Sequence, residues 1–248
     1  MLDIIDHGAV RELRLARPPV NALDGALVAA LRAALAEASR TPACRALVLS
    51  GQPGMFSAGL DVRALGALDL PGITGFLNEF TALQRDLAAA PLPVIAAITG
   101  HCPAGGTVLA LYCDYRIMAH GDWMIGLNEV QVGLYPGEVI MRAFERLVGP
   151  RRSADLLTRG ALLGPAAALE AGLVDELAAG EAVVTRALEY AQGLLALPPT
   201  AYRMTRELVR RDLVQSFERV EEQLVDRFRE IWFSDETRAR MRLLLSKR

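Results

Sequence analysis

Two short apolar runs, each followed at once by a glycine-containing turn, constrain the fold of this chain more than any other feature of its sequence. The first run is Ala46–Ser50, before the turn at residues 51–59, and the second is Val94–Ile98, before the turn at residues 100–106. Runs of this length and composition predict strands that are buried on both faces of a sheet. Because stretches with helical periodicity lie between them, the sequence predicts an α/β fold.

Other segments carry the periodicity of one strand or one helix. Further strands are predicted at residues 10–15 and 115–119, and helices at residues 23–39, 76–90 and 107–112. From Ala154 onward the pattern is almost wholly helical, with one long helix or two predicted at residues 200–233 and a last amphipathic helix at 235–246. This last helix has little core of its own, so we expect it to pack on another subunit or back across its own chain.

Length divides the chain into two expected regions. Its 248 residues are ample for one large core with a helical appendage. We place the core at residues 1–195 and the helical C-terminal region at 196–248.

Charge and cysteine content exclude several classes of protein. The formal net charge of -2 gives no basic excess for a nucleic-acid partner, and no apolar stretch has the length of a membrane span. The three cysteines, Cys44, Cys102 and Cys113, are an odd number without paired spacing, which is typical of a reducing compartment. Lys247 is the only lysine beside many arginines, a bias typical of GC-rich genomes. We therefore expect a cytoplasmic protein from a bacterium.

Several common catalytic motifs are missing. The sequence has no phosphate-binding P-loop, no dinucleotide-binding glycine motif after a strand, no serine nucleophile elbow and no H-E-x-x-H zinc motif. His7, His101 and His120 lack the spacing of metal ligands. We expect no bound metal and no nucleotide of the Rossmann type.

The two glycine-containing turns and one acidic loop are the candidates for chemistry. Glycine lets a main-chain N–H approach a ligand, and a helix start adds its own free N–H groups, so two such turns can hold an enolate oxygen. Taken alone, each turn also suits an ordinary link from strand to helix. Glu129 lies among apolar neighbours, where desolvation raises the pKa of a carboxylate and makes it a better base near neutral pH. A single loop glutamate is otherwise a common surface residue.

In combination these segments resemble the crotonase (enoyl-CoA hydratase/isomerase) superfamily. The resemblance covers most of the chain and is carried by FSAGLD, by PLPVIAAITGHCPAGGTVLALYCDYRIMA, by GLNEVQVGLYP, by LEAGLVDEL and by SDETRARMRLLLSKR. Within the superfamily the chain looks most similar to the mitochondrial-type Δ3,Δ2-enoyl-CoA isomerases, through RPPVNALD, FSAGLDV and IGLNEVQVGL. The implied fold is a spiral of ββα units with a helical C-terminal region that builds trimers, sometimes paired into hexamers.

The resemblance also implies a substrate and a site. The substrate is an acyl-CoA thioester, and coenzyme A is part of the substrate, so no separate cofactor is implied. The main-chain N–H groups of Leu60 and Gly105 are expected to form an oxyanion hole. Ala58 matches a segment whose main chain contacts the CoA adenine in relatives, and the turn near Asn21 matches another CoA-contacting region.

One position separates two reactions within the superfamily. Hydratases of the family usually carry two acids, but here Val108 stands at the first position and Glu129 at the second. A lone carboxylate suits a proton shuttle from C2 to C4 of a 3-enoyl thioester during fatty acid β-oxidation. Glu138 is a possible second acid, or else a surface residue at a helix start. Hydration of 2-enoyl-CoA therefore stays an alternative, as does an acyl-CoA-binding homologue without catalysis.

Overall fold

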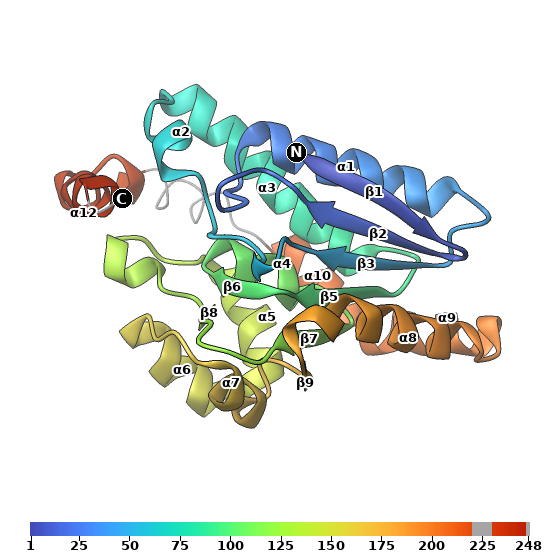
Figure 1. Ribbon diagram of the computed structural model, residues 1–248. Helices are drawn as coiled ribbons and strands as arrows, with labels where there is room; N and C mark the ends of the chain where they lie inside the picture. Colours follow the sequence, from blue (N-terminus) through green and yellow to red (C-terminus); the bar gives the residue numbers. More distant parts are fainter. Residues whose placement is uncertain (220–229, 247–248) are drawn as a thin grey trace.

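The two apolar runs are adjacent central strands of a six-stranded sheet in the computed structural model, which describes residues 1–219 and 230–246 (Figure 1). In sheet order the strands are β1 (Leu2–His7), β2 (Val10–Leu15), β3 (Ala46–Ser50), β5 (Val94–Ile98), β7 (Tyr115–Ala119) and β9 (Glu176–Ala178). β1 pairs antiparallel with β2, and the other neighbours pair in parallel. Every residue of β3 and β5 is buried, which explains why these runs are apolar almost throughout.

A second, smaller parallel sheet has the order β4 (Gly54–Met55), β6 (Gly100–Pro103) and β8 (Ile125–Gly126). Along the chain β3 leads into β4, β5 into β6 and β7 into β8, and helical structure follows each pair. This repeat confirms the predicted α/β fold as a spiral of ββα units. The small strands were absent from the sequence prediction because two to four residues are too few to show an alternating pattern.

The helices are α1 (Gly25–Arg40), α2 (Val62–Gly66), α3 (Leu70–Ala89), α4 (Gly105–Leu111), α5 (Glu138–Val148), α6 (Pro150–Arg159), α7 (Pro165–Ala171), α8 (Val183–Leu195), α9 (Pro199–Val209), α10 (Arg211–Gln215) and α12 (Asp235–Ser246). Turns of 3-10 helix cover Glu129–Val132, Gly180–Ala182 and Ser216–Arg219. α3 begins earlier than predicted because the Asp69 carboxylate caps its first turn, accepting from the Gly72 N–H at 2.9 Å. No helix among the described residues has the length and apolarity needed to cross a membrane.

Alternate side chains of the central strands point to opposite faces of the sheet and belong to two separate cores. Leu47 and Leu49 of β3 belong to the larger core, with residues of α1, α3 and α4. Ala46 and Val48 face the opposite side and pack against α8. Figure 1 shows α1 and α3 on one side of the large sheet and α8 on the other. The strands are therefore covered on both faces, as parallel strands require.

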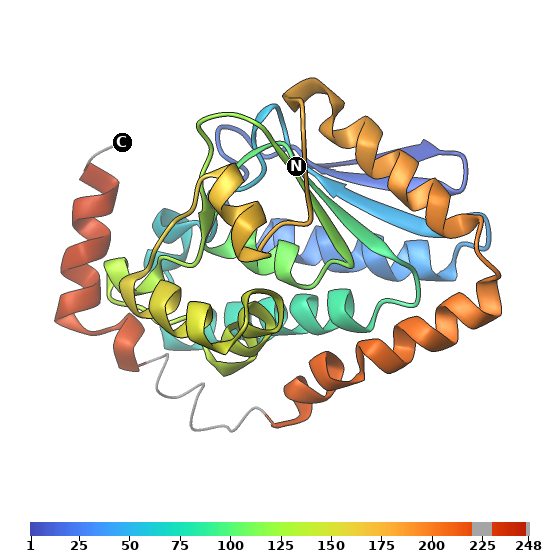
Figure 2. The same ribbon diagram turned by 90° about the horizontal axis from the view of Figure 1, so that it is seen from below.

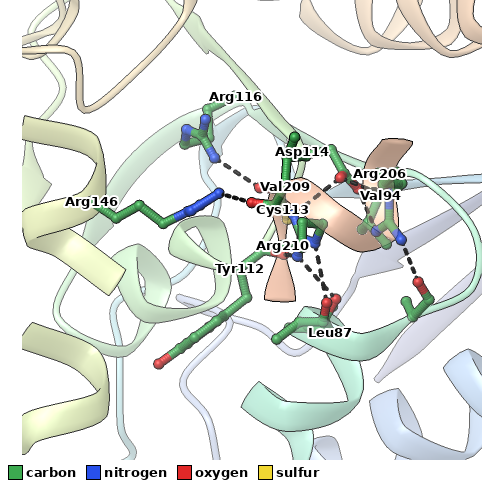
Figure 3. A network of polar contacts seen from close by, with 12 residues as sticks. Leu87, Val94, Tyr112, Cys113, Asp114, Arg116, Arg146, Arg206, Val209 and Arg210 are labelled. Atoms are coloured by element: carbon green, nitrogen blue, oxygen red, sulfur yellow. Dashed lines mark hydrogen bonds and ion pairs between the residues drawn. The ribbon is translucent and has the colours of Figure 1, made fainter. Parts of the chain in front are cut away.

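A half-buried carboxylate, that of Asp114, anchors the start of the C-terminal region (Figure 3). Asp114 follows α4 and accepts two hydrogen bonds of 2.8 Å from the Arg206 guanidinium and one of 3.0 Å from Arg210. The Val94 N–H donates to the same carboxylate at 2.8 Å. Arg210 also donates to the Tyr112 carbonyl at 2.6 Å. These bonds fix α9 against the start of β5 and the end of α4.

The last helix folds back on its own chain. Thr237 of α12 is buried and donates its hydroxyl hydrogen to the Gly133 carbonyl at 2.8 Å, so α12 packs beside the 3-10 turn at Glu129–Val132. This is one of the two packing arrangements predicted for the tail. Figure 2 shows α9 and α10 along one edge of the molecule and α12 at the far end.

Of three predictions about the C-terminal region, the structure bears on one. The helical pattern predicted at residues 200–233 is broken at Arg210, between α9 and α10, and residues 220–229 of it lie outside the described residues. The division at residue 195 stays a prediction. So does the trimer or hexamer.

Candidate functional site

A largely apolar cavity of about 130 Å³ lies where α3, α4, the 3-10 turn at Glu129 and the start of α5 meet. Most of its wall is made of aliphatic and aromatic side chains. The polar side chains of the wall are Thr81, Gln84, Glu129, Tyr135 and Glu138. A concave apolar surface with a few converging polar groups is the usual form of a small-molecule site.

Two main-chain N–H groups, those of Leu60 and Gly105, meet at the wall of this cavity. A Cβ atom built on Gly105 would lie 3.2 Å from the Leu60 nitrogen, and one built on Gly59 would lie 2.9 Å from the Gly105 nitrogen. Among the described residues neither N–H donates to another protein group. The two glycines therefore let the two turns approach closely, so that two main-chain donors without a protein acceptor lie side by side at the cavity wall.

The turn before α4, which carries the Gly105 N–H, has an unusual backbone conformation at Ala104. Ala104 has φ 49° and ψ -121°, a conformation that residues with a side chain rarely adopt. Its own N–H donates to the Gly126 carbonyl at 2.8 Å, which fixes the turn to β8. Gly106 lies two residues beyond Ala104, and a Cβ there would lie 2.6 Å from the Ser57 carbonyl oxygen. Close contact between the two predicted turns thus requires the glycine pair.

Glu129 is the strongest candidate for a base. It opens the 3-10 turn after Asn128, and its carboxylate oxygen Oε2 is buried without a hydrogen-bond partner among the described residues. The residue as a whole is half-buried, so the desolvation concerns the carboxylate end of the side chain. Burial raises the pKa of Glu129 to about 7, because a carboxylate removed from solvent loses stability in its charged form, and this outweighs the lowering effect of a hydrogen bond from its own main-chain N–H. Such a group gains and loses a proton readily near neutral pH.

Val108 stands at the position where hydratases of the superfamily usually carry their first acid. It lies one helical turn beyond Gly105 on α4, is 1% exposed and lines the cavity. Its side chain carries no proton that can be transferred.

Glu138 is the other carboxylate that lines the cavity, and it is the first residue of α5. Its side chain is 43% exposed and accepts a hydrogen bond of 2.8 Å from Arg142 on the next helical turn. The structure therefore places Glu138 at a helix start on the rim, partly in solvent.

Ala58 and Asn21, the two residues predicted to contact CoA, differ in what they leave free for a ligand. Ala58 is half-buried and donates its N–H to the Val20 carbonyl at 2.9 Å, so only its carbonyl is left for a ligand. Asn21 is 1% exposed, and its amide donates to the Phe56 carbonyl at 3.0 Å and accepts from the Arg17 N–H at 2.8 Å. The Asn21 side chain thus shapes the turn, and a ligand contact there stays a prediction.

A groove with three arginines lies beside α2, two residues beyond Leu60. Arg63, Arg238 and Arg242 line it, together with Val62, Gly66, Ala67, Trp232, Phe233 and Met241. Guanidinium groups in this number suit an anionic ligand. Sequence reasoning did not select these arginines, because they come from α2 and α12, far apart in a chain with many arginines. Their only signal is the four-residue spacing of Arg238 and Arg242 on one helix.

No group of three or more metal-binding side chains occurs within residues 1–219 and 230–246. The polar groups of the cavity are thus main-chain donors, carboxylates and neutral side chains. The arrangement can remove a proton from a carbon acid and stabilise the oxygen anion that results.

Comparison with known proteins gives a consistent relationship. The family model described as "Enoyl-CoA hydratase/isomerase" matches residues 6–248. The human protein named "Enoyl-CoA delta isomerase 1, mitochondrial" is 34% identical over 209 residues, which is 83% of this chain and 69% of that protein. A protein of Rhizobium meliloti named "Probable enoyl-CoA hydratase" is 33% identical over 208 residues, covering 84% of this chain and 80% of that protein.

A solved structure agrees with the sequence relatives. The crystal structure of human mitochondrial Δ3,Δ2-enoyl-CoA isomerase superposes with a TM-score of 0.94 at 28% identity, covering 99% of this chain and 97% of that one. The sequence relatives include both an isomerase and a probable hydratase at nearly the same identity. Their identities alone do not separate the two reactions.

Proposed function

This chain belongs to the enoyl-CoA hydratase/isomerase family, and we propose that it is a Δ3,Δ2-enoyl-CoA isomerase of fatty acid β-oxidation. One observation carries the proposal. Glu129 ends in a buried, unpartnered carboxylate oxygen and lines the same cavity as Gly105 and Leu60, while Val108 lines it without an acid. The site thus combines one base with two main-chain donors.

The proposed reaction moves one proton and one double bond. The Glu129 carboxylate removes a proton from C2 of a 3-enoyl-CoA, and the electron pair of the C–H bond forms a C1–C2 double bond as the C1–O π pair moves onto the oxygen, which gives a dienolate that still holds its C3–C4 double bond. The negative charge rests on the thioester oxygen, which accepts from the N–H groups of Leu60 and Gly105. Glu129 then returns its proton to C4, where the C3–C4 π pair forms the new C–H bond. The C1–C2 pair becomes the C2–C3 double bond and the thioester carbonyl is restored, which gives 2-trans-enoyl-CoA. A pKa of about 7 for Glu129 suits both transfers.

Hydration of 2-enoyl-CoA is the second candidate, and Glu138 is the observation that favours it. Adding water needs one group to activate the water and another to handle the proton at C2. Glu138 lines the cavity, but its carboxylate pairs with Arg142 and is partly in solvent. Both contacts keep the carboxylate turned toward Arg142 and the solvent at the rim. These contacts favour a reaction that uses Glu129 alone.

Binding of the CoA portion involves the surface around the Leu60 turn. We assign the adenine contact to the free carbonyl of Ala58 and to the turn at Asn21. The phosphates are anionic and suit Arg63, Arg238 and Arg242, which line the adjacent groove. The proposed chemistry uses only protein groups and the thioester itself, with CoA as part of the substrate.

Two assays on the same sample test the proposal. The protein is incubated with 3-octenoyl-CoA while formation of the conjugated 2-trans product is followed, and separately with 2-octenoyl-CoA while hydration is followed. An isomerase converts the first substrate much faster than it hydrates the second. Hydration without isomerisation would establish the hydratase instead. Tight thioester binding with neither reaction would identify a homologue that only binds.

A further inference from the structure

We propose that Gln84, held in place by Tyr112, is the floor of the acyl pocket and limits straight acyl chains to about eight carbons. This inference rests on the proposed function in one respect, that the cavity receives the acyl chain of a CoA thioester. It adds a substrate class, medium-chain thioesters, and a residue that selects it.

Gln84 is the most deeply buried polar side chain of the cavity wall. It is 3% exposed and lines the cavity from α3, where Leu77, Phe80 and Thr81 precede it at helical spacing on the same face. The hydroxyl of Tyr112, which is fully buried, donates to the Gln84 side-chain oxygen at 3.1 Å. This bond joins the inner end of the α3 face to the end of α4.

Positions along α4 give the depth of the pocket. Gly105, Val108 and Tyr112 lie on one face of the helix, and the first two line the cavity. From Gly105 to Tyr112 the helix rises about 10 Å, at roughly 1.5 Å per residue. A fully extended polypeptide advances up to about 3.6 Å per residue, which contains three main-chain bonds. An extended acyl chain therefore advances about 1.2 Å per bond. An acyl chain that runs along α4 from a thioester oxygen at Gly105 therefore comes level with Tyr112, whose hydroxyl holds Gln84, after about eight carbons.

The floor is closed by polarity as well as by volume. The side-chain nitrogen of Gln84 donates to no other described residue, so a methyl end pressed against it would remove its solvent without replacing the hydrogen bonds. Behind it, the Tyr112 ring packs against Phe217, with ring centroids 5.6 Å apart. A longer chain thus meets an unpaired amide backed by a packed aromatic pair.

Binding of saturated acyl-CoAs from C4 to C16, measured by calorimetry, tests the proposal. For the parent, affinity is expected to rise about fourfold per buried methylene up to C8 and to stay level beyond C10. The chain length at which affinity stops rising is called the break. In Gln84→Ala the break moves to longer chains. Gln84→Leu keeps the volume but removes the amide, so the C8 and C10 thioesters gain affinity relative to C4. Arg85→Ala, an exposed change at the next position of α3, keeps the break of the parent.

Three results would overturn the proposal: an affinity that rises steadily to C16 in the parent, an unchanged chain-length limit in a folded Gln84→Ala protein, or no gain for C8 and C10 relative to C4 in a folded Gln84→Leu protein. Saturated thioesters cannot isomerise, so this test is separate from the reaction. A break at C8 in a protein without isomerase activity would support the floor at Gln84 and refute the proposed function.

Discussion

The amide groups of Leu60 and Gly105 come from separate turns that lie in close contact, since a methyl group added at Gly105 would lie 3.2 Å from the Leu60 nitrogen. Each turn follows one of the small strands, β4 and β6, which pair directly. The spiral of ββα units thus brings two similar turns into contact, and the donors need no side chain. A site of this kind is sensitive to the smallest possible substitution.

Gly105→Ala is expected to lower kcat by about 10²–10³, the usual cost of losing one oxyanion donor. The added Cβ would lie 3.1 Å from the Gly59 Cα and 3.2 Å from the Leu60 nitrogen, which crowds the place of the thioester oxygen. Steady-state isomerisation kinetics measure the effect.

Gly193→Ala is the matched control for that substitution. Gly193 lies in α8, and a Cβ there meets nothing within 4 Å. Its kcat should equal that of the parent, with a gain in stability of about 0.5–1 kcal/mol from lower chain flexibility. Full activity in a folded Gly105→Ala protein would argue against the oxyanion hole.

The pH dependence of kcat/KM should report Glu129. Burial raises its pKa to about 7, and only the ionised carboxylate acts as a base. The rate is therefore expected to fall about tenfold per pH unit below pH 7 and to level off above it. A profile that stays flat down to pH 5 would mean that another group removes the proton.

Stability gives an independent measure of the same carboxylate. The folded-state pKa is about 7 and the ordinary value is 4.5, so the folded protein holds the proton more tightly. Ionising the buried carboxylate therefore lowers the free energy of unfolding. This loss is absent below pH 4.5, grows as the pH rises and is complete above pH 7. Glu129→Gln removes it and should be more stable than the parent at pH 8, by up to about 3 kcal/mol, but equal to it at pH 4. Denaturant unfolding at both pH values tests this; equal stabilities at pH 8 would contradict it.

Glu138→Gln separates the two candidate reactions. Because the Glu138 carboxylate pairs with Arg142 at the rim, its loss is expected to lower isomerisation by less than about tenfold, well short of a typical general-acid or general-base contribution. Kinetics on 3-octenoyl-CoA provide the measurement. A loss as large as that of Glu129→Gln would place Glu138 in the chemistry and favour a two-acid reaction.

Asp114→Asn should destabilise the protein by about 3–5 kcal/mol, since it leaves the buried guanidinium groups of Arg206 and Arg210 without their carboxylate. Arg203→Ala breaks an exposed pair with Glu207 on the same helix and should cost no more than about 0.5 kcal/mol. Urea unfolding compares the two variants. Similar losses for both would show that the Asp114 network contributes little.

Much of the fold was predictable because burial on both faces leaves a clear pattern. The strands Ala46–Ser50 and Val94–Ile98 were predicted with the bounds that the structure has. The edge strand β1 was missed because its side chains are mostly exposed or half-buried. β9 has only three residues, too few for a pattern.

The site was predictable where it depends on local motifs and hidden where it depends on packing. The turns at Leu60 and Gly105 and the loop at Glu129 carry motifs that single out the cavity. Gln84 looks like any polar residue of an amphipathic helix, and only contact with Tyr112 identifies the inner end of the pocket.

The central claim is that Glu129 alone moves the proton, and isomerisation of 3-octenoyl-CoA by Glu129→Gln at pH 8 tests it most directly. The account predicts that the folded variant binds the thioester as the parent does but forms 2-trans-octenoyl-CoA at least about 10²-fold more slowly, the lower end of a general-base contribution. Conversion at a rate close to that of the parent would contradict it and show that the base lies elsewhere.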